Sequence, residues 1–112
     1  MDRYRQIVAQ LKKFRDDREW EQFHDSKNLA SAISIESAEL NEIFLWKTIK
    51  ESEEVDINKV KEELADILSF TFLLADKHKL NPFDIIEEKI KVNAKKYPIT
   101  KAKGTAAKYT DL

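Results

Sequence analysis

Residues 34–46 read SIESAELNEIFLW, and at helical spacing this stretch places a carboxylate among apolar side chains. Glu36 projects into the middle of an apolar stripe, and Glu39, three residues on, projects at its edge. The stripe is made by Leu29, Ile33, Leu40, Ile43 and Phe44. Because residues three apart on a helix share a face, the two acids form an inward-facing pair.

A second acidic pair occurs in the segment EELADILSF, again on a predicted helix. Glu63 projects between Phe70 and Leu74, and Asp66 projects beside Leu73, so both acids lie among apolar neighbours. Unpaired carboxylates that are buried together cost several kcal/mol each, in order of magnitude, unless they are protonated or neutralised. We therefore expect the two pairs to share a cation.

The chemistry of the four acids favours a hard divalent cation, Mg²⁺ or alternatively Mn²⁺, because all their ligand atoms are oxygens. The chain has no cysteine and only two histidines to favour zinc. A di-iron bundle would need two Glu-x-x-His motifs, and only Glu21 to His24 matches, in a break between helices. The remaining alternatives are four solvated acids, or acids neutralised in part by Lys61 or Lys89.

The composition predicts an all-α fold, because one glycine and two prolines are too few for the turns of a β-protein. We expect four helices, over about residues 2–18, about 26–50, about 57–79 and about 82–96. Asp25 or Ser26, Asp56 or Asn58, and Asn81 before Pro82 are the expected caps of the last three helices. The expected fold is a four-helix, bundle-like domain spanning 1–112, with an extended C-terminal tail over about 98–112.

Charge and composition also exclude several classes of protein. The net charge of −1 argues against nucleic acid or an anionic membrane as the main partner. A single glycine rules out a glycine-rich phosphate loop and a dinucleotide-binding fingerprint. No segment approaches the length of a transmembrane helix, and MDRYRQIVAQ lacks the apolar run of a signal peptide, so we expect a cytoplasmic protein. A domain of 112 residues with so many apolar helix faces also suggests a homo-oligomer.

At the acidic motifs ESAE (36–39) and ELAD (63–66), the sequence resembles the MazG-like all-α nucleoside triphosphate pyrophosphohydrolases, and in particular their dCTP pyrophosphatase branch. The family motif is E-x-x-E followed after a variable gap by E-x-x-D. The flanking blocks that extend the resemblance are RDDREWEQFHDSKNL, FLWK, EELADILSF, KIKVNAKKYP and the terminal KYTDL. Together they cover nearly the whole chain from about Phe14 to Leu112.

The resemblance implies a MazG fold that hydrolyses a deoxynucleoside triphosphate, with dCTP or a modified dCTP as first choice, to the monophosphate and pyrophosphate. It implies a Mg²⁺ site formed by Glu36, Glu39, Glu63 and Asp66, with no catalytic residue assigned apart from these ligands. The positions matching the base pocket are Trp20, Glu21, Gln22, Phe23, His24, Trp46 and Phe70. The positions expected to contact phosphates or brace the acids are Lys89, Asn93, Lys96 and Tyr97. The family's assemblies are homodimers and homotetramers.

Two positions depart from the dCTP pyrophosphatase branch. Phe70 stands where that branch has a tyrosine, and Leu11 stands where it has a histidine. A pocket without those polar groups should discriminate between bases less sharply. Two other substrates of the superfamily, dUTP-like nucleotides and phosphoribosyl-ATP, therefore stay open. The rival outside the enzyme class is a non-catalytic helical oligomerisation or regulatory module.

Overall fold

The computed structural model describes residues 2–112, whose regular secondary structure is entirely helical. The expected all-α class is confirmed. The four longer helices are α1 (Arg3–Asp17), α2 (Ser26–Phe44), α4 (Ile57–Lys77) and α5 (Pro82–Lys96). The shorter segments are η1 (Glu21–Phe23), α3 (Ile49–Ser52), α6 (Ile99–Ala102) and η2 (Tyr109–Asp111). These elements form two units, the first ending at Lys79 and the second spanning Leu80–Leu112, and each is described by itself.

The helices begin at residues whose side chains satisfy free backbone amides. The Asp25 carboxylate accepts a hydrogen bond from the Asn28 amide at 2.8 Å, at the start of α2. Asp56 caps α4 in the same way, and Asn81 caps α5 with Pro82 at the first helical position. Each cap stabilises its helix by about 1 kcal/mol. The three predicted cap sites are thus confirmed.

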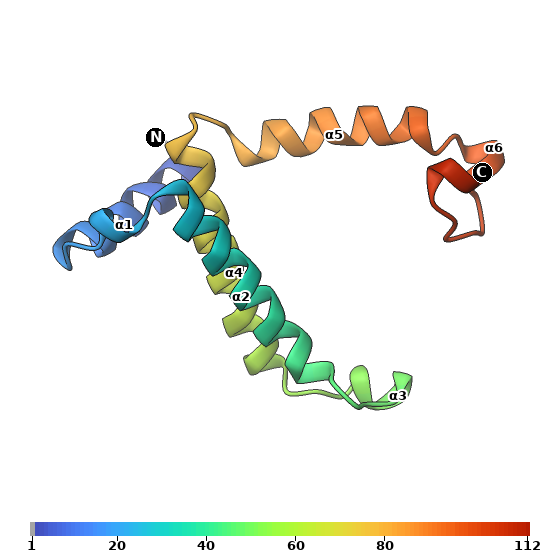
Figure 1. The fold of residues 1–112 in the computed structure, drawn as a ribbon, viewed down its shortest axis with the longest axis horizontal. Helices are drawn as coiled ribbons and strands as arrows, with labels where there is room; N and C mark the ends of the chain where they lie inside the picture. Colours follow the sequence, from blue (N-terminus) through green and yellow to red (C-terminus); the bar gives the residue numbers. More distant parts are fainter. Residues whose placement is uncertain (1) are drawn as a thin grey trace. The chain divides into compact units, whose positions relative to one another are not determined.

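In the first unit, α2 and α4 run antiparallel and lie side by side along most of their length (Figure 1). Leu29 of α2, together with Leu73 and Ala75 of α4, is buried, and Val8 adds a buried residue from α1. This small core lies toward the end of the helix pair where α2 begins and α4 ends. The middle of the pair is free to carry polar side chains inward.

Polar and aromatic contacts fix α1 against α4. Lys12 forms a salt bridge of 2.7 Å with Asp76, and the Tyr4 and Phe72 rings meet edge to face with centroids 5.2 Å apart. Both contacts join the same two helices, so α1 has a defined position beside the C-terminal half of α4. The residues between α1 and α2 are thereby held next to that half of α4.

The second predicted helix was too long. α2 ends at Phe44, not near residue 50, and the chain turns at Trp46, which has a positive φ of 63°. A separate helix, α3, then begins at Ile49, and its N-cap residue Thr48 forms a capping box with Glu51. Such a box satisfies two amides reciprocally, so it starts a new helix in place of continuing the old one.

In the second unit, α5 is followed by a tail that differs from the extended one expected. The tail contains α6 and η2, and the Tyr109 ring of η2 meets the Tyr97 ring edge to face at 5.9 Å. The Lys96 ammonium lies 4.8 Å from the centroid of the same Tyr109 ring. These contacts hold η2 against the end of α5, because aromatic and cation–π pairs each contribute about 1 kcal/mol.

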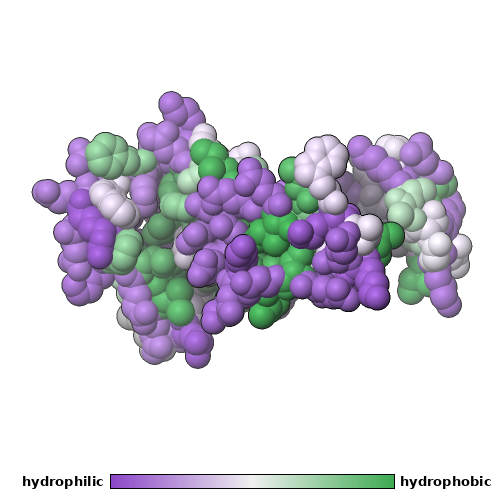
Figure 2. Space-filling view, turned by 90° about the horizontal axis from the view of Figure 1, so that it is seen from below, coloured by the Kyte–Doolittle hydropathy of each residue, from purple (hydrophilic) through white to green (hydrophobic). Residues whose placement is uncertain are grey.

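Large apolar side chains also reach the surface of the first unit. Ile35 on α2 and Leu68 on α4 are each more than half exposed, at 59% and 52%. Figure 2 shows hydrophobic side chains at the surface among hydrophilic ones. The small core of the unit leaves these apolar side chains in contact with solvent, and exposed apolar patches often mark an interaction surface.

Candidate active site

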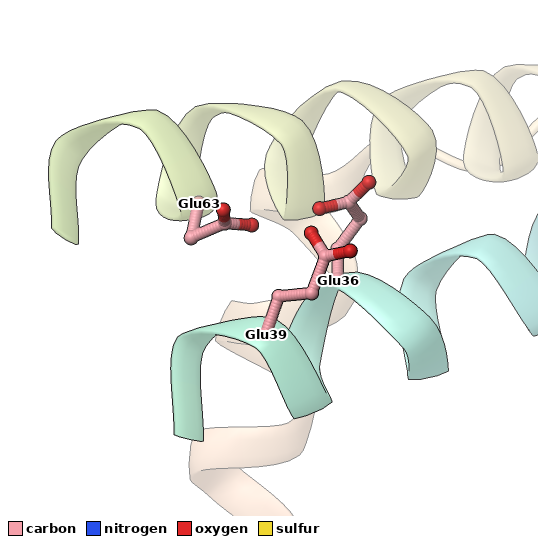
Figure 3. Close-up of side chains that lie close together, drawn as sticks. All are labelled: Glu36, Glu39 and Glu63. Carbon is pink, nitrogen blue, oxygen red and sulfur yellow. The ribbon is translucent and has the colours of Figure 1, made fainter. Parts of the chain in front are cut away.

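Three glutamates meet between α2 and α4. Glu36 and Glu39 come from α2 and Glu63 from α4, and one carboxylate oxygen of each lies within 4.8 Å of the others (Figure 3). The helical spacing explains the arrangement, because residues three apart in α2 present both acids to the facing helix. As predicted, the Glu36 and Glu63 side chains point inward, between the two helices.

The environment of Glu36 disfavours its charged form. A hydrogen bond with Glu63, burial and the adjacent Glu39 raise the pKa of Glu36 from 4.5 to about 7. The second oxygen, Oε2, of both Glu36 and Glu63 is buried without a hydrogen-bond partner. Buried carboxylate oxygens are costly to leave unpartnered, so this cluster lacks a positive group.

The residues around the cluster do not supply that positive group. Among the described residues of the first unit, no lysine, arginine or histidine forms a salt bridge with any of the four acids singled out. Lys61 therefore does not neutralise them. Three converging carboxylates with two unpartnered oxygens fit a hard divalent cation, which accepts oxygen ligands and would take the place of the proton on Glu36.

The fourth acid, Asp66, lies one turn beyond Glu63 on α4 and outside the three-carboxylate cluster. Its charge still contributes to the raised pKa of Glu36. Its side chain lines a separate pocket on the side of the cluster toward α1. Asp66 therefore stands between the cluster and that pocket.

The pocket beside Asp66 is lined mainly by rings and apolar side chains, and we call it the aromatic pocket. Trp20, His24 and Phe70, three of the residues predicted to form a base pocket, all line it. His24 and Phe70 meet edge to face with ring centroids 6.2 Å apart. The pocket measures about 320 Å³, which suits a small planar ring system.

Sequence reasoning missed several residues of the aromatic pocket. Phe14 and Arg15 of α1 and Ser69 and Leu73 of α4 line it, beside Leu11, which the sequence analysis had singled out. The Phe14 ring meets the Trp20 ring at 5.9 Å, and the guanidinium of Arg18 lies 3.6 Å from the Phe14 centroid. Phe14 belongs to the apolar stripe of the first predicted helix, a pattern that predicts a core residue. Its place in the aromatic pocket follows only from the packing of α1 against α4.

Histidine 24 is held neutral more readily than a free histidine. Burial, and next the charge of Arg15, lower the pKa of His24 below its ordinary value of 6.5. Its Nδ1 atom is buried without a hydrogen-bond partner. The aromatic pocket therefore presents an uncharged imidazole at neutral pH.

The other loop residues predicted for the base pocket lie elsewhere. Glu21 faces Arg15, with 3.9 Å between carboxylate and guanidinium, and lines a different, smaller cavity. The Gln22 amide donates a hydrogen bond to the Glu19 carbonyl at 2.8 Å, and the Phe23 side chain is 57% exposed. None of the three lines the aromatic pocket in the described chain.

Trp46 also lies outside the pocket. The prediction placed it on a continuous helix with Glu39, and that placement is wrong because α2 ends at Phe44. Trp46 is 92% exposed and lines neither of the pockets beside the acids within this chain. An indole so exposed contacts little of its own unit.

Four predicted residues belong to the second unit. Lys89 and Asn93 lie one turn apart on α5, and both are exposed within the described chain. Lys96 and Tyr97, at the end of α5, contact Tyr109 as described above. The predicted shared face of Lys89 and Asn93 follows from their helical spacing.

A second cavity flanks the acids on the side toward α3, and we call it the polar groove. Glu39 and Glu63 form its wall next to the cluster. Its other charged residues are Glu42, Lys47, Asp56, Lys59 and Glu62, and its volume is about 610 Å³. The acids thus lie between one mainly aromatic and one mainly charged cavity.

Comparison with known proteins decides the family. Residues 31–112 match the model of the MazG-like family, which is most of the chain and includes all four acids. The chain belongs to the MazG-like family. This MazG-like match begins inside α2, so α1 and the loop that carries Trp20 and His24 lie outside it.

Relatives and a solved structure extend the similarity over more of this MazG-like chain. Over 104 residues, 88% of the chain, it is 36% identical to dCTP pyrophosphatase 1 of Bos taurus and 34% identical to that of Homo sapiens. The chain spans 62% and 61%, respectively, of the length of these two curated relatives. A crystal structure of a pyrophosphatase from Archaeoglobus fulgidus matches with 39% identity and a TM-score of 0.83, over 88% of this chain and 94% of that one.

Within the part of the chain that the structure describes, none of the helices is both long enough and apolar enough to span a bilayer. The longest, α4, has 21 residues but carries charged side chains throughout its first half.

Proposed function

We propose that this chain is a Mg²⁺-dependent nucleotide pyrophosphohydrolase. It hydrolyses a deoxynucleoside triphosphate between the α and β phosphates, giving the monophosphate and pyrophosphate, and removes unwanted nucleotides from the cytoplasmic pool. The observation that carries the proposal is the cluster of Glu36, Glu39 and Glu63, with two buried unpartnered oxygens, directly beside an aromatic pocket.

The residues that would hold the cation are Glu36, Glu39, Glu63 and Asp66. When bound, Mg²⁺ supplies charge stabilisation to phosphate oxygens and acidifies water, the two effects that phosphoanhydride hydrolysis most needs. The acids themselves keep the cation between α2 and α4, within one turn of the aromatic pocket. Asp66 lies at the boundary between the two and so aligns the sugar-phosphate part of a bound nucleotide with the cluster.

The aromatic pocket would bind the base. Trp20, Phe70 and Phe14 offer ring surfaces for stacking, and stacking on aromatic side chains contributes about 1–3 kcal/mol per base. We take dCTP or a 5-modified dCTP as the first choice, because curated relatives that share about a third of the sequence are dCTP pyrophosphatases. Phe70 and Leu11 both line the pocket, and neither side chain offers a polar group to a base. This leaves dUTP-like nucleotides and phosphoribosyl-ATP as alternatives.

The remaining proposed contacts rest on the family resemblance. Trp46 and the loop residues Glu21, Gln22 and Phe23 would approach the base. Lys89, Asn93, Lys96 and Tyr97 of the second unit would contact phosphates or brace the acids. In a complex these side chains would supply the cationic and aromatic groups that the cluster lacks in its own unit.

Association into a homodimer or homotetramer is part of the proposal. Ile35, Leu64 and Leu68 are exposed apolar residues on the two central helices, and a second copy could bury them. Trp46, which contacts little of its own unit, would then be available to a neighbouring subunit. Sedimentation of the purified chain measures the assembly, and a monomer at micromolar concentration would contradict this part of the proposal.

The deciding experiment is a pyrophosphate-release assay with Mg²⁺ over all common and several 5-modified nucleoside triphosphates. We expect pyrophosphate and the monophosphate from at least one deoxynucleotide, dCTP or its derivatives first. Release of orthophosphate would contradict the proposed bond of attack, and a preference for dUTP or phosphoribosyl-ATP would reassign the substrate.

A thermal melt separates the enzyme from a non-catalytic helical module. Mg²⁺ at a hundredfold excess over its Kd should stabilise the chain by about 2.7 kcal/mol. For a domain of this size the midpoint should rise by about 10 °C. Glu36→Gln should abolish that rise. If Mg²⁺ has no effect, Glu63→Ala is stabilising and no nucleotide yields pyrophosphate, the chain is a module and not an enzyme.

A further inference from the structure

One face of α4 carries residues of both cavities and of the acidic cluster in a single line. Lys59, Glu63, Asp66, Phe70 and Leu73 follow one another at spacings of four, three, four and three residues. This spacing keeps side chains on one side of a helix. The line therefore runs from the polar groove, past the acids, into the aromatic pocket.

The length of this line fits a nucleoside triphosphate. Phe70 and Lys59 are eleven residues apart, which at helical rise is about 16 Å along the axis. A nucleotide with its base on Phe70 and its α phosphate at Glu63 and Asp66 therefore directs its β and γ phosphates toward Lys59. The polar groove is the space into which that end of the molecule extends.

Two lysines, Lys47 and Lys59, line the polar groove. After the hydrogen bonds from Thr48, the charge of Lys47 also lowers the pKa of Glu51, a carboxylate that does not line the groove. Within the first unit, neither Lys47 nor Lys59 forms a salt bridge with any described acid, although Glu42, Asp56 and Glu62 line the same groove. Both lysines have a defined backbone position. The Lys47 amide donates a hydrogen bond to the Phe44 carbonyl at 3.2 Å, and Lys59 lies in the first turn of α4.

The N-terminus of α4 adds favourable potential for an anion at the same place. Val55 and Asp56, just before the helix, line the groove, and a helix of 21 residues has a partial positive charge at this end. The Asp56 carboxylate already accepts a hydrogen bond from the Asn58 amide and so uses part of that potential. The two ammonium groups must supply the rest.

The charges of the groove decide the form in which phosphate can bind. Apart from Glu39 and Glu63, which belong to the acidic cluster, three acids face two lysines. This excess of negative charge, which Glu39 and Glu63 increase, repels a free tetravalent anion, but the groove accepts an anion whose charge is reduced by a divalent cation. On the basis of the proposed function, we infer that Lys47 and Lys59 bind the pyrophosphate half of the substrate, and the pyrophosphate product, together with its cation.

The test compares ligands with and without the pyrophosphate half. Lys59→Ala, Lys47→Ala and the double variant are titrated by calorimetry, in Mg²⁺, with pyrophosphate, with the α,β-methylene analogue of dCTP, which cannot be cleaved, and with dCMP. Each single variant should weaken pyrophosphate and analogue binding about tenfold, since a hydrogen bond to a charged group is worth about 1.5 kcal/mol or more. Binding of dCMP should be unchanged.

Matched controls come from the same elements. Lys61→Ala removes the same charge from α4, and Lys50→Ala removes it from α3, yet neither residue lines the groove. Both controls should bind all three ligands as the wild type does, and Lys59→Arg should restore most of the loss in Lys59→Ala. Circular dichroism checks that each variant is folded.

Three outcomes would overturn the inference: unchanged pyrophosphate binding in the double variant, an equal loss for dCMP, or an equal loss in Lys61→Ala. The calorimetric readout needs no turnover. A wild-type chain that binds pyrophosphate through these lysines but hydrolyses no nucleotide would therefore count against the proposed function and not against the lysines.

Discussion

The aromatic pocket and the polar groove flank the same three glutamates but offer different chemistry. The pocket is lined by rings and apolar side chains from α1, the loop after it and α4. The groove is lined by acids and lysines from α2, α4 and the connection between them. Under the proposed function, the pocket selects the base and the groove holds the phosphates, on opposite sides of one cluster.

The contrast also separates the sequence regions that carry each task. The cluster and the groove come from the two central helices and their connection, whereas the pocket needs α1 and the loop with Trp20 and His24. The MazG-like match covers residues 31–112 and so leaves the pocket's loop outside. Changes in the loop should alter which base is accepted, and changes in the acids should affect every nucleotide alike.

The largest effect should come from the cluster. In Glu63→Gln a neutral amide replaces a carboxylate with a buried, unpartnered oxygen, so the site loses a charged ligand. Charge stabilisation by a bound cation is worth several kcal/mol, which corresponds to a loss of pyrophosphate release of about 10³-fold. The loss should be equal for all substrates, measured as initial rates over the nucleotide panel.

The control for this variant is Glu54→Gln, an exposed acid in the connection before α4 that lines neither cavity. It should retain wild-type activity. Without metal, Glu63→Gln should also melt no lower than the wild type, because the amide can keep the hydrogen bond to Glu36 while the cluster carries one fewer carboxylate. A loss confined to one base would contradict the division between cluster and pocket.

A smaller effect is expected from the pocket wall. Trp20→Ala removes the ring that meets Phe14 edge to face, and with it a stacking surface for the base. Because stacking contributes about 1–3 kcal/mol per base, KM should rise roughly 10- to 100-fold with little change in kcat. Trp20→Phe should recover most of the affinity. A fall in kcat at unchanged KM would place Trp20 outside the base site.

A change at Phe70, in the aromatic pocket, should alter base selectivity more than the overall rate. Phe70→Tyr introduces a hydroxyl into a pocket where the ring centroid of His24 lies 6.2 Å from that of Phe70. One neutral hydrogen bond is worth about 1 kcal/mol, so the ratio of kcat/KM for dCTP over dTTP should rise about fivefold. Leu11→Met, which adds no hydroxyl group to the pocket, should not change the ratio. An equal gain for both nucleotides would contradict a role in base selection.

Local signals in the sequence predicted the helical class, the helix caps and the direction of the central acids. Asp25, Asp56 and Asn81 act within one turn of themselves, so their capping roles could be read without a structure. The inward direction of Glu36 and Glu63 follows from helical periodicity alone. These features depend on neighbours no more than four residues away.

The features that sequence reasoning missed depend on longer-range or subtler signals. Arg15 and Ser69 line the aromatic pocket only because α1 packs against the C-terminal half of α4. The end of α2 did have a local signal, since Thr48 and Glu51 have the spacing of a capping box. That box predicts a new helix at residue 49 and would have removed Trp46 from α2.

The smallest effect expected is a shift in the titration of His24. Burial and the Arg15 charge lower its pKa below 6.5, so the unfolded chain takes up this proton at higher pH than the folded chain does. The contribution of His24 to the free energy of unfolding is therefore complete at pH 7 and declines as the pH falls below 6.5. With only two histidines in the chain, an NMR titration of His78→Gln follows His24 alone. Arg15→Met should move the midpoint part of the way back toward 6.5, because burial remains. A midpoint above 6.5 in the His78→Gln chain would contradict the lowered pKa, and one above 7 would mean that His24 adds a positive charge to the aromatic pocket at neutral pH.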